Sequence, residues 1–225
     1  MALNIVQKID GDVAIRNVLI SVSDKRGLAS FVPGLVSACA GVRIFSTGGT
    51  YDLLRALPGM DGHLVAVSDY TGQPEMQGGL VKTLDFKIYL GLLSETYNPA
   101  HQADLARTAA VAIDMVIVNL YPFAQTVTQA DVTPEEARTH IDIGGPCMIR
   151  AAAKNYLRVA SVTDPADYED ILTEIRAGSG VIGLSRRLDL MRKAFAHTAA
   201  YDAAISAYFG NVQEACVRAC YKLEA

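Results

Sequence analysis

The chain has 225 residues, of which 51% are hydrophobic and 20% are charged, so we expect a single α/β domain with a substantial core. Its formal net charge of −4 leaves no basic excess for nucleic-acid binding, and no apolar run is long enough to span a membrane. The four cysteines lack zinc-ligand spacing and the N-terminus makes a poor signal peptide, so a cytoplasmic protein without a metal is expected.

Short β-branched runs alternate with helical patterns along much of the chain. Asn17–Val22 predicts a buried strand and Gly41–Ser46 a second one, each followed by a polar turn and a helix. Further strands are predicted at Leu64–Val67, Met115–Asn119 and Leu157–Val162. Because such strands are continuously apolar, they favour a parallel sheet that helices cover on both faces.

Two helices and a long helical pattern are predicted after the fourth strand. The Thr-Pro-Glu-Glu sequence at Thr133 combines an N-cap, a proline in the first turn and two acids. Asp164-Pro165 repeats this start before another helix. Ser185–Tyr208 has a long helical pattern, and the segment 178–183 that precedes it is predicted to be a loop.

Polar residues follow the first two predicted strands, where an open parallel sheet binds its ligands. Ser21–Lys25 follows the first strand, and Thr47-Gly48-Gly49-Thr50 follows the second. The glycines let the backbone approach an anion, the hydroxyls donate hydrogen bonds, and the next helix presents free N–H groups. This pattern indicates an anion site, and a plain tight turn would be equally compatible with it. Neither a Walker A loop nor a GxGxxG fingerprint is present, which argues against an ATPase and a dinucleotide enzyme.

Three further polar groups follow the fourth predicted strand. They are Asn119–Phe123, the carboxylate Asp142 beside a double glycine, and Lys154 at the end of an Ala-rich helical turn. Each alone is also compatible with a solvated charge or a helix cap. Only their combination points to a site.

Eight motifs, in this order along the chain, resemble the cyclohydrolase half of the bifunctional AICAR formyltransferase/IMP cyclohydrolases of purine synthesis. They are SVSDK (Ser21–Lys25), STGGT (Ser46–Thr50), SDYTGQPEM (Ser68–Met76), VKTL (Val81–Leu84), NLYPF (Asn119–Phe123), IDIGGP (Ile141–Pro146), AAAKN (Ala151–Asn155) and FAHTAAYDAAIS (Phe195–Ser206). The resemblance implies an α/β fold of the methylglyoxal-synthase-like (MGS-like), Rossmann type: a parallel sheet with helices on both faces and a C-terminal helical segment.

The resemblance also implies an activity. An IMP cyclohydrolase, a hydrolase acting on a cyclic amidine, closes formylated aminoimidazole carboxamide ribotide to IMP with loss of water. The ligand would be a small ribonucleotide monophosphate, with no cofactor, metal, nucleic acid or membrane. Residues 1–225 would be one domain, with about 1–16 as an N-terminal extension and no formyltransferase domain. A separate formyltransferase would then supply the substrate, and a homodimer is compatible with this reading.

Site residues follow from the matching motif positions. Asp142 would be the base that deprotonates the carboxamide nitrogen, Lys82 or Lys154 the acid, and Tyr121 a hydroxyl donor. The catalytic set implied is Lys82, Tyr121, Asp142 and Lys154. The substrate-binding set is Ser21, Ser23, Lys25, Thr47, Gly48, Gly49, Thr50, Thr83 and Gly144.

Four positions depart from the family pattern. Leu80 replaces an arginine, and Asp85, Tyr89 and Tyr156 each replace a histidine. Three of the four lie close together in the sequence, so these departures leave other functions open. The alternatives are a non-catalytic phosphate- or nucleotide-binding regulatory module, a lyase acting on a small phosphorylated sugar, and cyclisation of a related nucleotide.

Overall fold

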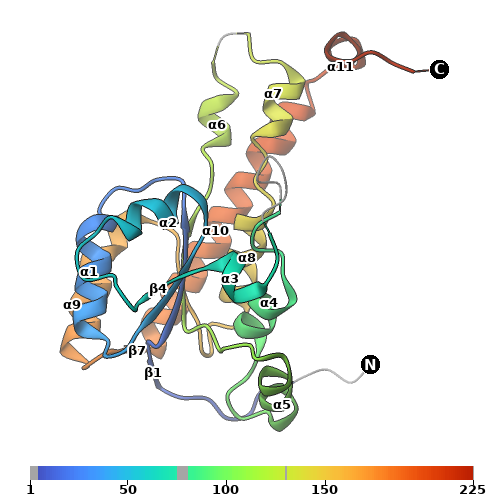
Figure 1. Ribbon diagram of the computed structural model, residues 1–225. Coiled ribbons are helices and arrows are strands. Elements are labelled where there is room, and N and C mark those ends of the chain that lie inside the picture. Colours follow the sequence, from blue (N-terminus) through green and yellow to red (C-terminus); the bar gives the residue numbers. More distant parts are fainter. Residues whose placement is uncertain (1–4, 75–80, 130, 225) are drawn as a thin grey trace.

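A five-stranded parallel sheet forms the centre of the computed structural model, which describes residues 5–74, 81–129 and 131–224 (Figure 1). The strand order is β4-β3-β2-β5-β6, and every neighbouring pair is parallel. The predicted parallel sheet is confirmed. The strands are β2 (Asn17–Val22), β3 (Arg43–Ser46), β4 (Leu64–Ala66), β5 (Met115–Asn119) and β6 (Ala160–Val162).

The connections between these strands create a crevice at one edge of the sheet. The chain starts the sheet at β2, adds β3 and β4 on one side, and then returns to add β5 and β6 on the other. The carboxyl ends of β2 and β5 are therefore neighbours, with Val22 opposite Asn119. The loops that leave them diverge in opposite directions, which is where open α/β sheets bind ligands.

Helices cover both faces of the sheet, as the apolar strands predict. On one face, α1 (Leu28–Ala38) and α9 (Tyr168–Ala177) contribute to a core that includes Val18 and Ile20 of β2. On the other, α4, α8 and α10 contribute to a core that includes Leu19, because successive side chains of a strand point to opposite faces. The bounds of these three helices are Phe86–Leu93, Gly144–Lys154 and Leu184–Phe209.

The remaining helices are short. They are α2 (Gly48–Arg55), α3 (Val67–Thr71), α5 (Pro99–Thr108), α6 (Phe123–Thr126), α7 (Pro134–Thr139), α11 (Glu214–Cys220) and a 3₁₀ turn (Pro165–Asp167). Together with the C-terminal half of α10, α6 and α7 extend beyond the sheet (Figure 1). In the described part of the chain, no helix is long and apolar enough to cross a membrane.

Phe123 of α6 is the residue that α10 packs against in this extension. Its ring is 1% exposed, and its centroid lies 6.3 Å from that of Tyr201, 6.0 Å from that of Tyr208 and 6.5 Å from that of Phe209. Aromatic rings at such separations attract each other in addition to burying area. The loop that follows β5 is thereby held against the long helix.

The segment 178–183, predicted to be a loop, contains a strand instead. Val181–Gly183 (β7) pairs antiparallel with Asp12–Ala14 (β1), which lies within the predicted N-terminal extension. Arg187 of α10 is fully buried beside this pair and donates hydrogen bonds to the carbonyl groups of Gly11 and Ile182, among others. The prediction was wrong because a three-residue strand has too little periodicity to detect, and its partner lies about 170 residues away.

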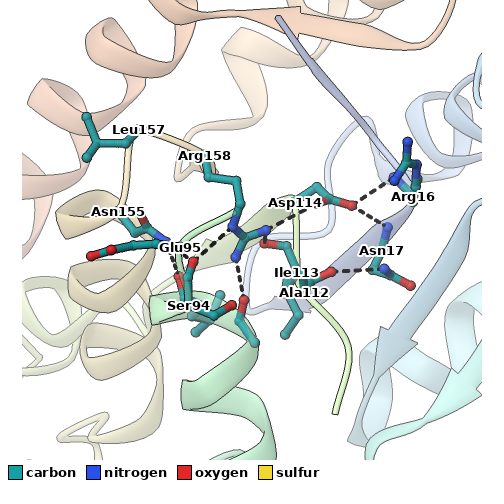
Figure 2. Close-up of polar contacts among 12 residues, drawn as sticks. Arg16, Asn17, Ser94, Glu95, Ala112, Ile113, Asp114, Asn155, Leu157 and Arg158 are labelled. Atoms are coloured by element: carbon teal, nitrogen blue, oxygen red, sulfur yellow. Dashed lines mark hydrogen bonds and ion pairs between the residues drawn. The ribbon is translucent and has the colours of Figure 1, made fainter. Parts of the chain in front are cut away.

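A buried ion pair joins the sheet to two of its covering helices at the edge opposite the crevice (Figure 2). The Arg158 Nη1 atom lies 3.2 Å from Asp114 Oδ1, and Arg158 also donates to the carbonyl groups of Gly91 and Ser94 at the end of α4. Asp114 Oδ2 accepts from the backbone N–H groups of Arg16 and Asn17, where β2 begins. The ion pair and these hydrogen bonds to the backbone therefore hold together β2, β5, α4 and the segment that follows α8.

Replacing Arg158 by methionine should destabilise the fold strongly. The variant leaves the Asp114 carboxylate buried without its counter-charge, and breaking such a pair from one side costs about 3–5 kcal/mol. Chemical denaturation of the two proteins measures the difference. Arg107→Met is the matched control, because the Arg107–Asp104 pair is largely exposed and should contribute at most about 1 kcal/mol. Equal losses in the two variants would contradict the role given to Arg158.

Candidate functional site

A cavity of about 400 Å³ lies in the crevice between the carboxyl ends of β2, β3 and β5. Residues from five separate stretches of sequence line it, and the fold brings these stretches together. Of the thirteen predicted site residues, twelve lie in its lining: Ser21, Ser23, Lys25, Thr47, Gly48, Gly49, Thr50, Lys82, Thr83, Tyr121, Asp142 and Gly144.

One end of the cavity is formed by the loop after β2 and the start of α2. Ser23 and Lys25 come from the loop, and Thr47, Gly48 and Gly49 come from the first turn of α2. The first N–H groups of a helix have no partner within the helix, and the helix dipole favours an anion there. This end has the donors and the positive charge that a phosphate requires.

Two side chains hold the end of β2 and the loop after it in place by hydrogen bonds to the backbone. The Thr50 hydroxyl accepts from the Val22 N–H group at 3.2 Å and donates to the Val22 carbonyl at 3.1 Å. The Asn119 side chain accepts from the Asp24 N–H group at 2.7 Å and donates to the Asp24 carbonyl at 2.9 Å. Thr50 was predicted to bind substrate, and this geometry gives its hydroxyl a backbone-holding role at the wall of the cavity.

Lys82 reaches the cavity beside the start of α2. A Cβ atom on Gly48 would lie 3.0 Å from the Lys82 Nζ atom, and Gly48 has a positive φ of 53°. Glycine is therefore favoured at this position both by its backbone conformation and by the space that the ammonium group needs. The ammonium group adds a positive charge close to the helix N-terminus.

Asp142 lines the cavity from the link between α7 and α8. Its Oδ1 atom accepts from the Gly145 N–H group at 2.9 Å. A Cβ atom on Gly145 would lie 2.4 Å from Asp142 Oδ2, so the double glycine leaves the room that this carboxylate occupies. Burial raises the pKa of Asp142, and the hydrogen bond from Gly145 opposes part of that rise. A carboxylate with a raised pKa is a stronger base than an ordinary aspartate.

Thr83, Gly144 and Tyr121 complete the lining. Thr83 is 4% exposed, and a Cβ atom on Gly144 would lie 3.0 Å from its Oγ1 atom, so α8 starts close against this hydroxyl. Tyr121 is 57% exposed, which places its phenol at the mouth of the cavity. The cavity thus combines an anion-binding end with a carboxylate, an ammonium group and a hydroxyl.

Lys154 does not line this cavity. It is the last residue of α8, about 15 Å along the helix axis from Gly144, and it is exposed. It borders a separate, mainly apolar surface pocket with Tyr89, Met191 and Phe195. The sequence did not reveal this separation. The IDIGGP and AAAKN motifs are only about ten residues apart in the sequence, yet they lie at opposite ends of α8.

The residues that depart from the family pattern lie at different places relative to the main cavity. Leu80 lies outside the described residues. Asp85 is the N-cap of α4 and accepts from the Lys87 N–H group at 2.8 Å, while the Lys87 ammonium group donates to the Tyr70 carbonyl. Tyr89 borders the pocket that Lys154 lines. Within the described residues, none of Asp85, Lys87 and Tyr89 lines the main cavity.

Two functional residues were not identified from the sequence. Asn119 and Gly145 both belong to quoted motifs, yet their roles depend on contacts with Asp24 and Asp142 that the sequence does not display. An asparagine that ends a buried strand is a usable signal, because a polar side chain there must find a partner.

Comparisons with known proteins identify the family of the chain. Residues 27–147, just over half of the chain, match the sequence model described as the MGS-like domain, and residues 152–224 match the AICARFT/IMPCHase bienzyme. A solved structure titled "Crystal structure of ForH" superposes with a TM-score of 0.76 at 34% identity, over 87% of this chain and 97% of that one.

Curated relatives include bifunctional purine biosynthesis proteins PurH. The protein from Magnetococcus marinus is 51% identical over 192 residues, which is 85% of this chain and 35% of the relative. The protein from Bacillus subtilis is 46% identical over 200 residues, 89% of this chain and 38% of the relative. The chain thus spans little more than a third of the length of these relatives.

Replacing Asp142 by asparagine should leave the fold at least as stable at pH 8. A carboxyl whose pKa is raised by folding binds its proton more tightly in the folded chain, so its ionised form destabilises the fold above that pKa. Asparagine removes the charge and can still accept from Gly145. We expect a gain on the order of 1 kcal/mol in urea denaturation at pH 8, shrinking as the pH falls through the raised pKa.

Asp61→Asn is the control for this measurement, because Asp61 is exposed in the turn before β4. Its effect should be within about 0.5 kcal/mol at both ends of the pH range. A clear loss of stability in Asp142→Asn at pH 8 would contradict the burial argument.

Proposed function

Since the chain belongs to the MGS-like domain family and is homologous to the part of the PurH proteins that carries the IMP cyclohydrolase domain, we propose that it is itself an IMP cyclohydrolase of purine biosynthesis. The substrate would be formylated aminoimidazole carboxamide ribotide, and the product IMP. One observation carries the proposal: Lys82, Tyr121 and Asp142 lie in the same cavity as the anion-binding loops.

The two ends of the cavity suit the two ends of this substrate. Its 5′-phosphate fits the end with Ser23, Lys25 and the first turn of α2, where donors and positive charge are concentrated. The carboxamide and formamide groups would then lie towards Asp142 and Lys82. Holding both reacting arms in one orientation contributes to the rate by itself, since the reaction is intramolecular.

Ring closure with loss of water requires a series of proton transfers that these side chains can perform. Asp142 takes a proton from the carboxamide nitrogen, which then forms a bond to the formyl carbon. The formyl oxygen accepts a proton from Lys82 as negative charge develops on it. That oxygen takes a second proton, from the protonated Asp142, and leaves as water. The former formamide nitrogen gives its proton to the neutral Lys82 as the C=N bond of the ring forms, so both side chains return to their starting states. The phenol of Tyr121, which is exposed at the mouth of the cavity, would donate a hydrogen bond to the same oxygen.

Lys154 and the homodimer are linked proposals. The cavity of one chain does not include Lys154, which lies at the far end of α8. A catalytic Lys154 would therefore come from a second copy of the chain, for which the homodimer provides the arrangement. The separate formyltransferase that supplies the substrate is also a proposal.

The activity is tested with purified protein and formylated aminoimidazole carboxamide ribotide, following IMP by ultraviolet absorbance against the spontaneous reaction. Asp142→Asn and Lys82→Met should each lower kcat by about 10²- to 10⁴-fold, the usual contribution of a general base or acid. Lys87→Met is the control, since Lys87 contacts Tyr70 outside the cavity. Its kcat should stay within about 2-fold of wild type.

The dependence of kcat on pH distinguishes an Asp142 that acts as the base from one that only lines the cavity. Because burial raises the pKa of Asp142, kcat should rise with pH through a midpoint above about 4, the ordinary aspartate range. Asp142→Asn should lose that rise. Tight binding of IMP without any turnover would instead favour the non-catalytic binding module.

A mixing experiment tests Lys154. Lys154→Met and Asp142→Asn should each be poorly active alone. If the lysine comes from the partner, an equal mixture restores about a quarter of the sites, because half of the dimers are mixed and each has one complete site. Full activity of Lys154→Met would remove Lys154 from the mechanism, and two inactive variants that stay inactive when mixed would contradict a shared site.

A further inference from the structure

The backbone that carries Asp142 is held by a tyrosine about 60 residues further along the chain. The Asp142 N–H group donates to the Tyr201 hydroxyl at 2.8 Å, and that hydroxyl donates to the His140 carbonyl at 3.3 Å. A tyrosine hydroxyl has one donor and can also accept, so both of these backbone groups are satisfied by one side chain. Tyr201 is 9% exposed.

The segment that carries Asp142 has no regular secondary structure of its own. Residues 140–143 form an irregular connection between α7 and α8, and Ile143, the N-cap of α8, makes no side-chain capping hydrogen bond. Two glycines follow directly, and glycine restricts the backbone least of all residues. The contact from Gly145 holds the Asp142 carboxylate, while Tyr201 holds the Asp142 main chain.

Tyr201 is packed into the core by its neighbours. It lies in the C-terminal half of α10, a 26-residue helix that packs along α8. Its ring contacts Phe123 edge-on, with the centroids 6.3 Å apart. The ring thus contributes to the core, and only the hydroxyl reaches the Asp142 link.

We infer that Tyr201 is a positioning residue for the reaction: its hydroxyl fixes the backbone at Asp142 and thereby the place of the carboxylate in the cavity that Lys82 also lines. This role rests on the proposed function, because it matters only where Asp142 acts as the base. The hydroxyl, rather than the ring, carries the effect.

Tyr201→Phe tests the inference because it removes the hydroxyl and keeps the ring. Displacing a catalytic group by about 1 Å can cost up to about 10²-fold, so kcat should fall about 10- to 100-fold while KM changes less than about 3-fold. Tyr208→Phe is the matched control: Tyr208 lies on the same helix, its ring also contacts Phe123, and its hydroxyl donates to Val132 instead. Its kcat should stay within about 2-fold of wild type.

A double variant distinguishes positioning from a general loss of structure. If Tyr201 acts through Asp142, adding Tyr201→Phe to Asp142→Asn should not lower the residual rate further. A further fall by the factor seen in the single variant would overturn the inference, as would an unchanged kcat in Tyr201→Phe.

Amide hydrogen exchange, followed by NMR, gives a readout that does not need activity. Tyr201→Phe should accelerate exchange at the Asp142 N–H group at least about 10-fold and leave the amides in the middle of α8 unchanged. Unchanged exchange at Asp142 would overturn the inference. Absence of turnover in the wild type would overturn the proposed function, and the exchange rate would still decide whether Tyr201 holds this backbone.

Discussion

The buried pair between Arg158 and Asp114 is the contact on which the geometry of the site depends. It joins the starts of β2 and β5 to the ends of α4 and α8 at one edge of the sheet. At the opposite ends of the same elements lie Val22, Asn119, the Lys82 segment before α4 and the double glycine that begins α8. Because strands and helices are stiff, holding one edge of the sheet also determines how the side chains of the cavity face one another at the other.

Groups of opposite charge line the same cavity. Lys25, Lys82 and two helix N-termini provide positive potential, and Asp142 is the carboxylate set among them. Burial raises the pKa of that carboxylate, and the hydrogen bond from the Gly145 N–H group opposes part of the rise. The glycines leave room for the charged groups, as at Gly48 and Gly145, where a side chain would collide with the lysine and the aspartate. An anion can therefore bind at one end while a proton acceptor remains available at the other.

Much of this arrangement could be predicted from the sequence, because continuous apolar strands and glycine-marked turns are local patterns. The parallel sheet follows from these patterns, and the twelve cavity-lining residues follow from the resemblance to the cyclohydrolase motifs. What could not be predicted depends on distant contacts. The β1–β7 pair joins segments about 170 residues apart, and Tyr201 contacts Asp142 across about 60 residues. Lys154 lies outside the cavity because it is at the opposite end of α8 from Gly144.

A crystal structure of the protein with bound IMP would show whether one cavity binds the two ends of a ribonucleotide in a defined direction. We expect the phosphate to lie against Ser23, Lys25 and the first turn of α2, with the purine ring between Lys82 and Asp142. A nucleotide bound in the reverse direction, or in another pocket, would contradict the proposed binding mode.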